Sequence, residues 1–87
     1  MLEIFVTPTF TRSYNKLSAE VRRKADSKTS IFKQNPFYSS LRTKKLEPNH
    51  QEIWSFWIDK DYRIKFRFVD SKQVHLLYIG NRKDIYK

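Results

Sequence analysis

The sequence predicts an α+β domain in which an N-terminal strand and a helical hairpin precede an antiparallel sheet meander. Three observations point to this class. A short apolar run begins the chain, two stretches with helical spacing follow it, and the second half consists of strand-like runs separated by short polar turns. A chain of 87 residues has the length of one small core, so we expect a single domain over 1–87.

The first half reads as a strand followed by two helices. The apolar run 2–6 is stopped by Thr7-Pro8, and proline suits the first turn of a helix, where its missing N–H is not needed. Apolar residues then recur at i, i+4 and i+7, and the first helix is expected to end near Leu17. Ser18 is expected to cap a second helix, which Asn35-Pro36 ends.

The second half reads as a loop and three strands. Residues 37–49 are expected to form a loop that leads into a short strand. The strands are expected at 53–58, 62–69 and 74–79, with Gly80 breaking the last one before a short tail. The helical hairpin would then cover one face of the sheet and leave the other face open.

Strand 62–69 alternates between apolar and basic residues, so its two faces differ. One face is expected to be core, together with Trp54 and Trp57 of the preceding strand; its residues are Tyr62, Ile64, Phe66 and Phe68. The other face is expected to display Arg63, Lys65 and Arg67 in a row. Taken alone, such a row is also compatible with an ordinary solvated strand face.

Composition favours a polyanionic partner. Eighteen Lys and Arg against nine Asp and Glu give a net charge of +9. Nucleic acid or an acidic protein is therefore the first expectation. Aromatic residues make up 16% of the chain, and aromatic rings can stack unpaired bases.

Several chemistries are disfavoured by the residue content. The absence of cysteine removes disulfides, zinc ribbons and thiol nucleophiles, and His50 and His75 have no carboxylates at ligand spacing, so no metal or other cofactor is expected. A single glycine excludes a glycine-rich phosphate loop. No apolar run is long enough to cross a membrane, which favours a cytoplasmic protein with no membrane partner.

Three segments of the second half resemble the RelE/ParE superfamily of toxins from bacterial type II toxin-antitoxin systems, especially its RelE-type mRNA interferase branch. They are LRTKKL, IWSFWIDKDYRIKFRFV and VHLLYIGNRKDIY, and the similarity is best over residues 36–86. The most specific matches are Asp61-Tyr62-Arg63-Ile64, at a strand start, and Ile79-Gly80-Asn81-Arg82 followed by Ile85-Tyr86.

The resemblance implies a microbial-ribonuclease-like domain that cleaves mRNA in the ribosomal A site and so inhibits translation. A cognate antitoxin would hold it inactive, and the toxin-antitoxin complex would bind operator DNA. Arg63 would stabilise the phosphate, Arg82 would lie near the leaving group, and Tyr86 would stack a base or assist proton transfer. Lys44, Lys45, Lys65 and Arg67 are candidate RNA-binding residues.

The resemblance also leaves departures and alternatives. Some members carry two lysines where this chain has Trp54-Ser55-Phe56, and some have histidine where Arg82 stands. ParE-type members of the superfamily poison DNA gyrase instead, and a catalytically degenerate relative would only bind its antitoxin. A shared fold does not decide among these functions.

Overall fold

The computed structural model describes residues 1–46 and 52–85. Within these ranges the secondary-structure elements are β1 (Glu3–Val6), α1 (Pro8–Asn15), α2 (Ala19–Gln34), the 3-10 turn η1 (Ser39–Leu41), β2 (Lys44–Lys45), β3 (Trp54–Trp57), β4 (Tyr62–Phe68), β5 (Gln73–Asn81) and α3 (Arg82–Ile85). The predicted α+β class is confirmed, and the expected tail contains a short helix.

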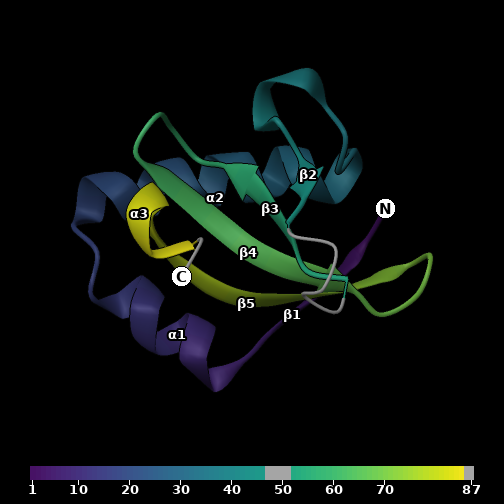
Figure 1. Ribbon diagram of the computed structural model, residues 1–87, viewed down its shortest axis with the longest axis horizontal. Coiled ribbons are helices and arrows are strands. Elements are labelled where there is room, and N and C mark those ends of the chain that lie inside the picture. The colour runs from purple at the N-terminus through teal and green to yellow at the C-terminus, as the bar shows by residue number, and fades with distance from the viewer. Residues whose placement is uncertain (47–51, 86–87) are drawn as a thin grey trace.

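The strands form one mixed sheet in the order β1-β5-β4-β3-β2. Strands β2 to β5 make the predicted antiparallel meander, while β1 pairs with β5 in parallel. In Figure 1, α2 passes behind the sheet and α3 lies in front of it. The two faces of the sheet are therefore covered by different helices.

Both long helices begin at a side-chain cap. The Thr7 hydroxyl accepts a hydrogen bond from the N–H of Phe10 at 3.1 Å, and the Ser18 hydroxyl accepts one from the N–H of Val21 at 3.2 Å. The predicted Ser18 cap is confirmed. Helix α1 ends at Asn15, slightly before the expected Leu17, and α2 ends at Gln34 with Asn35 as its C-cap.

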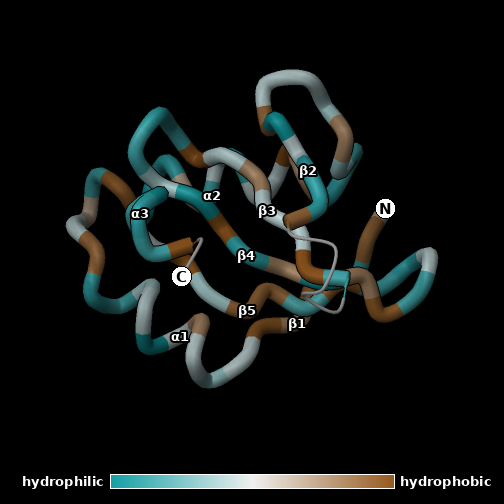
Figure 2. The backbone as a smooth tube through the Cα atoms, in the orientation of Figure 1, coloured by the Kyte–Doolittle hydropathy of each residue, from teal (hydrophilic) through white to brown (hydrophobic). Residues whose placement is uncertain are grey.

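The core lies between the sheet and the two long helices. Phe32 of α2 is fully buried; its ring stacks on Phe56 with centroids 4.3 Å apart and meets Phe66 edge-on at 4.8 Å. Figure 2 shows the alternation of hydrophobic and hydrophilic residues along β4 that gives the sheet its apolar side. Burial of each large side chain contributes about 1.5–3 kcal/mol.

A bulge in β5 keeps this apolar side in register. Lys65 pairs with Tyr78, but the next residue of β4, Phe66, pairs with Leu76. Leu77 is thus the extra residue. Its carbonyl accepts a hydrogen bond from the Thr7 hydroxyl at 3.2 Å, which connects the N-cap of α1 to the bulge.

Two sequence-based expectations are wrong. Gly80 does not break the last strand, because β5 continues through it to Asn81 and Gly80 pairs with Arg63. Trp57 does not join the core, because it pairs with Arg63 on the side of the sheet that faces away from α2. The strict alternation along β3, which leaves Trp54 and Phe56 on the core side, requires this placement.

No helix within 1–46 and 52–85 has both the length and the apolar character needed to cross a membrane.

Candidate nucleic-acid interface

The sheet side that faces away from α2 carries a group of cations, which we call the basic face: Lys44, Arg63, Lys65 and Arg67. Its centre is a row across four strands. Lys44 lies opposite Ser55, Ser55 lies opposite Lys65, and Lys65 lies opposite Tyr78. Residues directly opposite each other share a face, so pairing alone brings Lys44 and Lys65 to the same side.

Lys65 and Arg67 are accessible on this face. Lys65 is half-buried, and its Nζ lies 6.0 Å from the centroid of the Tyr78 ring. Arg67 is exposed and lies opposite His75, whose ring meets Phe5 edge-on at 5.8 Å. Because successive same-face residues of a strand are about 7 Å apart, the two cations can contact different phosphates of one nucleic-acid strand.

The sequence suggested that Arg63 projects from an exposed row of cations. In the structure it does not, because the basic face is covered at this end of the sheet. Only 4% of its surface is exposed. The guanidinium carbon lies 3.9 Å from the centroid of the Trp57 ring, and Nη1 donates hydrogen bonds to the carbonyls of Asp59 at 2.8 Å and Tyr62 at 3.2 Å. This arginine therefore contacts protein groups that fix the turn before β4.

A second arginine also contacts the Trp57 ring. The guanidinium carbon of Arg42 lies 4.5 Å from the Trp57 ring centroid, and Arg42 is exposed. Its backbone has a positive φ of 48° at the end of η1, which turns the chain toward β2. Neither residue was predicted as part of the site, since Trp57 lies in an apolar run typical of a core strand and Arg42 lies in a segment without periodicity.

Helix α3 covers part of the basic face. Ile85 is 1% exposed, yet it is separate from the core cluster between the sheet and the long helices, and α3 contacts β4 and β5. The face is thus closed at the Arg63 end and accessible further along β4. The expectation of a fully open face is wrong, because the residues after Gly80 fold back as a helix.

Arg82 lies at this covered end. It is the first residue of α3 and is exposed, and its N–H donates to the carbonyl of Asp61 at 2.7 Å. Gly80, which precedes it by two residues, pairs with Arg63. The fold therefore brings the backbones of Arg63 and Arg82 to the same end of β4 and β5.

The turn before β4 is held by a carboxylate. Asp59 Oδ1 accepts hydrogen bonds from the N–H groups of Asp61 and Tyr62, each at 2.8 Å, and Oδ2 lies 3.5 Å from Lys24 Nζ. Partial burial opposes ionisation of Asp59, but the two N–H donors and the ammonium outweigh it, so the pKa of Asp59 lies below its usual value. The carboxylate stabilises the turn that Arg63 also binds.

Gly80 is required by a close approach of an aromatic side chain. A Cβ at this position would lie 2.6 Å from Cε2 and 2.9 Å from the hydroxyl oxygen of Tyr78. Only glycine lets the Tyr78 ring cross over the strand without displacement. The same ring flanks Lys65, so Gly80 helps to shape the surface of the basic face.

Of the two predicted site residues that remain, the structure describes Lys45 but not Tyr86. Lys45 pairs with Trp54, so it belongs to the opposite side of the sheet from Lys44, and its Nζ forms an ion pair with Glu52 Oε1 at 2.9 Å. Tyr86 and His50 fall outside the described residues. Among the described residues no cluster of three His, Cys, Asp or Glu side chains could hold a metal ion.

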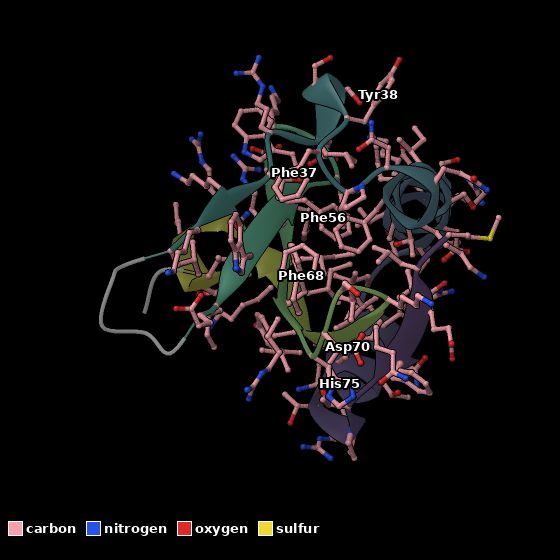
Figure 3. All side chains as sticks on the ribbon, turned by 90° about the vertical axis from the view of Figure 1, so that its right-hand side faces the viewer. Phe37, Tyr38, Phe56, Phe68, Asp70 and His75 are labelled. Carbon is pink, nitrogen blue, oxygen red and sulfur yellow. The ribbon has the colours of Figure 1, made fainter. Side chains whose placement is uncertain are left out.

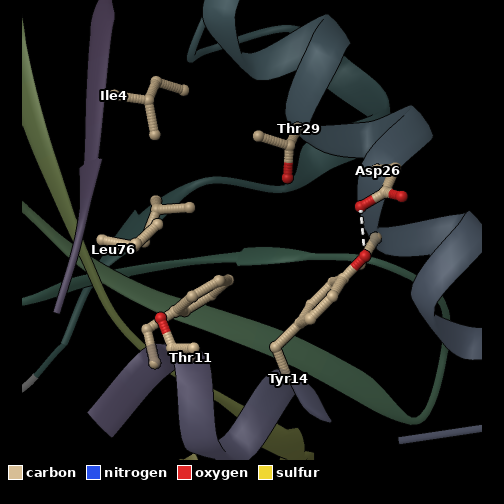
Figure 4. Close-up of a pocket in the computed structure, with 9 residues that line it drawn as sticks. Ile4, Thr11, Tyr14, Asp26, Thr29 and Leu76 are labelled. Carbon is tan, nitrogen blue, oxygen red and sulfur yellow. Dashed lines mark hydrogen bonds between the residues drawn. The ribbon is translucent and has the colours of Figure 1, made fainter. Parts of the chain in front are cut away.

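A separate cavity of about 370 Å³ lies between β1, α1 and α2, on the other side of the sheet from the basic face (Figure 4). Ile4, Phe10 and Leu76 contribute its apolar lining. At its rim the Tyr14 hydroxyl donates to Asp26 Oδ1 at 2.8 Å. Burial and this carboxylate raise the pKa of Tyr14 above its usual value, so the phenol stays protonated.

Comparison with solved structures identifies the fold. A YoeB/ParE toxin from Agrobacterium tumefaciens matches with a TM-score of 0.76 and 15% identity, over 93% of this chain and 99% of the other. YafQ from Escherichia coli matches with a TM-score of 0.77 and 12% identity over 100% of both chains. The RelE-RelB complex from the archaeon Pyrococcus horikoshii matches with a TM-score of 0.73 and 16% identity, over 93% and 94%.

The chain therefore has the RelE/YoeB-type toxin fold, as the resemblance implied. Among the similar solved structures, YoeB-YefM from Staphylococcus aureus and DinJ-YafQ from Escherichia coli are toxin-antitoxin complexes. No protein-family profile matches the chain, and no curated protein matches its sequence. The similarity to this fold thus resides in the arrangement of helices and strands more than in sequence.

Proposed function

We propose that this protein is the toxin of a type II toxin-antitoxin system and that it cleaves mRNA on the ribosome, acting in the cytoplasm. The observation that carries the proposal is the basic face on a RelE/YoeB-type fold that spans the chain. A positively charged sheet surface with an aromatic ring at its centre suits a single RNA strand.

The chemistry proposed is attack of a ribose 2′-hydroxyl on the adjacent phosphate: the 2′-oxygen loses its proton and bonds to phosphorus while the bond from phosphorus to the 5′-oxygen of the next nucleotide breaks. The products are a 2′,3′-cyclic phosphate and a 5′-hydroxyl, whose oxygen takes up a proton. During the attack, negative charge builds on the nonbridging oxygens, and a guanidinium can stabilise this charge because it forms two parallel hydrogen bonds and stays protonated. Arg82 is exposed at the end of the basic face and is proposed to make this contact. Tyr86 is proposed to stack the neighbouring base.

Lys44, Lys65 and Arg67 are proposed to bind the RNA backbone on either side of the cleaved bond. Lys45, on the opposite side of the sheet, is proposed to bind RNA at the β2 edge. Arg63 is proposed to act from beneath the surface: its buried charge adds positive potential, and its contacts with the 59–62 turn hold the end of the sheet from which Arg82 projects.

Inhibition is proposed to come from an antitoxin whose acidic segment covers the basic face. The net charge of +9 favours such a partner and also favours ribosomal RNA. The solved complexes of RelE with RelB and of YafQ with DinJ support an antitoxin partner for this fold. The toxin-antitoxin complex is proposed to bind operator DNA.

The test is a cell-free translation reaction with purified protein, in which the 5′ ends of mRNA are mapped by primer extension. New cuts that depend on ribosomes are expected, and Arg82→Ala should reduce their rate by roughly 100-fold. Lys83→Ala, at the neighbouring exposed position, is the matched control and should cut nearly as well as the parent protein. Ribosome-free RNA should remain intact.

Intact mRNA with undisturbed translation would contradict the proposal. A DNA supercoiling assay with gyrase then separates the two alternatives, since a ParE-type poison inhibits gyrase and a degenerate relative inhibits neither process. Cleavage that persists in Arg82→Ala would leave the ribonuclease function in place and remove Arg82 from the site.

A further inference from the structure

A cluster of aromatic rings lies on the α2 side of the sheet, at the end of β4 remote from Arg63. We call it the aromatic patch: Phe37, Trp54 and Phe68. In Figure 3, Phe37 lies beside Phe56 and Phe68 on the side of the sheet that faces α2, whereas Tyr38 points away. The patch thus lies on the opposite side and at the opposite end of the sheet from the proposed catalytic site.

The rings of the patch hold one another in place. Phe37 stacks on Phe68 with centroids 6.1 Å apart and meets Trp54 edge-on at 5.8 Å. Trp54 in turn meets Phe68 edge-on at 5.6 Å. The N–H of Phe37 donates to Asn35 Oδ1 at 3.0 Å, and Pro36 restricts the chain between them, so the position of Phe37 is fixed before any ligand arrives.

Phe37 is nevertheless 57% exposed, which leaves much of a large apolar ring in water. Single exposed apolar residues are ordinary, but this ring joins two others and borders a cavity of about 510 Å³. Leu2, Pro36, Phe37 and Phe68 contribute the apolar lining. A concave apolar site of this size accepts a bulky side chain.

The charges at this cavity are mainly positive. Lys33, at the end of α2, and Lys72, in the turn between β4 and β5, both line it and are exposed. The carboxylate of Asp70 also lies there, but its Oδ1 accepts hydrogen bonds from the N–H groups of Lys72 at 2.8 Å and Gln73 at 2.9 Å. Asp70 therefore shapes the turn and keeps its negative charge, but the two lysines outnumber it, so these three side chains favour an acidic partner.

We propose that the aromatic patch and its cavity form a second docking surface, whose occupant is a protein segment carrying a bulky apolar side chain flanked by acidic residues. The apolar side chain enters the cavity against Phe37, and the acidic residues contact Lys33 and Lys72. A protein segment fits better than RNA, because the rings pack on one another and the row of cations lies on the basic face. On the side of the patch, Lys45 lies opposite Trp54 but forms an ion pair with Glu52. This inference does not depend on the proposed ribonuclease function.

The test is a titration of the full chain, labelled with ¹⁵N, with a capped hexapeptide that has a central Trp-Leu pair and two Glu on each side. Amide shifts are expected at Lys33, Phe37 and Lys72. Two further hexapeptides serve as controls: one with Ala-Ala in place of Trp-Leu keeps the charge, and one with Gln in place of Glu keeps the apolar pair. Both should bind at least about tenfold more weakly.

Two protein variants complete the test. The double substitution Lys33→Glu with Lys72→Glu should weaken peptide binding by about tenfold or more. The matched control, Arg23→Glu with Lys60→Glu, makes the same change in net charge at exposed positions away from the cavity and should alter binding less than about threefold. Phe37→Ala should also abolish saturable binding, and its amide spectrum reports whether it has folded.

Three outcomes would overturn the proposal. The first is no saturable binding of the Trp-Leu peptide up to millimolar concentration. The second is amide shifts that map to Lys65, Arg67 and Arg82, which would place the peptide on the basic face. The third is an unstructured RNA octamer that produces the shifts at Lys33 and Phe37 in place of the peptide, which would make the patch a nucleic-acid surface.

Discussion

The two sides of the sheet share the same strands but are built on different principles. The α2 side is a continuous apolar core in which Phe32, Phe56 and Phe66 are fully buried. Within the described residues, the basic face carries the exposed Lys44 and Arg67 and the half-buried Lys65, and α3 packs on it at the Arg63 end. One alternating strand, β4, thus supplies both the apolar residues that pack the core and cations of the basic face.

The largest loss of stability is expected from a substitution in the core, on the apolar side of the sheet. Phe32→Ala should lower the free energy of unfolding by about 3–5 kcal/mol, because it removes the ring that joins Phe56 to Phe66 and leaves a cavity. Urea denaturation followed by Trp fluorescence measures this loss. Phe37→Ala is the matched control, since Phe37 is largely exposed; an equal loss in the two variants would contradict the assignment of the core.

The next largest loss of stability is expected at the end of the basic face that α3 covers. Arg63→Ala should cost about 2–4 kcal/mol, because it removes the stacking on Trp57 and two hydrogen bonds to carbonyls. Arg67→Ala, the same change at an exposed position of the same strand, should stay within about 0.5 kcal/mol in the same denaturation experiment.

Substitution of Asp59 should cause a smaller loss of stability, and this loss should depend on pH. Asp59→Ala should cost about 1.5 kcal/mol at neutral pH, since two backbone N–H groups lose their acceptor. Because the folded-state pKa is lowered, the carboxylate stabilises the fold above its unfolded pKa and loses this effect as pH falls through the folded pKa. Thermal unfolding of both proteins between neutral pH and pH 2 should therefore converge at the acid end, and a constant difference would count against this role.

The smallest loss of stability is expected from a substitution of Gly80. It tests whether the contact between Gly80 and the Tyr78 ring shapes the basic face. Gly80→Ala should cost about 1 kcal/mol, because the added Cβ displaces the Tyr78 ring. In a Tyr78→Ala background the same change should cost nothing, since the obstructing ring is gone. A double-mutant cycle measures this coupling, and additive costs would show that the ring contact is not the cause.

Much of the fold could be predicted because its signals are local. Ser18 caps α2 as its side-chain chemistry predicts, and the alternation along 62–69 separates the apolar residues from Lys65 and Arg67 as expected. The candidate site was predicted less well. Nothing local indicated that Trp57 would lie over Arg63 or that α3 would fold back, because both depend on which residues meet across strands and on what covers them.

The class of fold, the order of its elements and the strongly positive charge follow from the sequence, since periodicity, caps and composition are properties of short segments or of the chain as a whole. Which cations are exposed depends on the packing of the folded chain. Arg63 and Arg67 are the same residue type on the same face of one strand, yet one is buried beneath Trp57 and the other is exposed. Burial depends on neighbours distant in sequence, so it followed from the packing of α3 and β3 against β4.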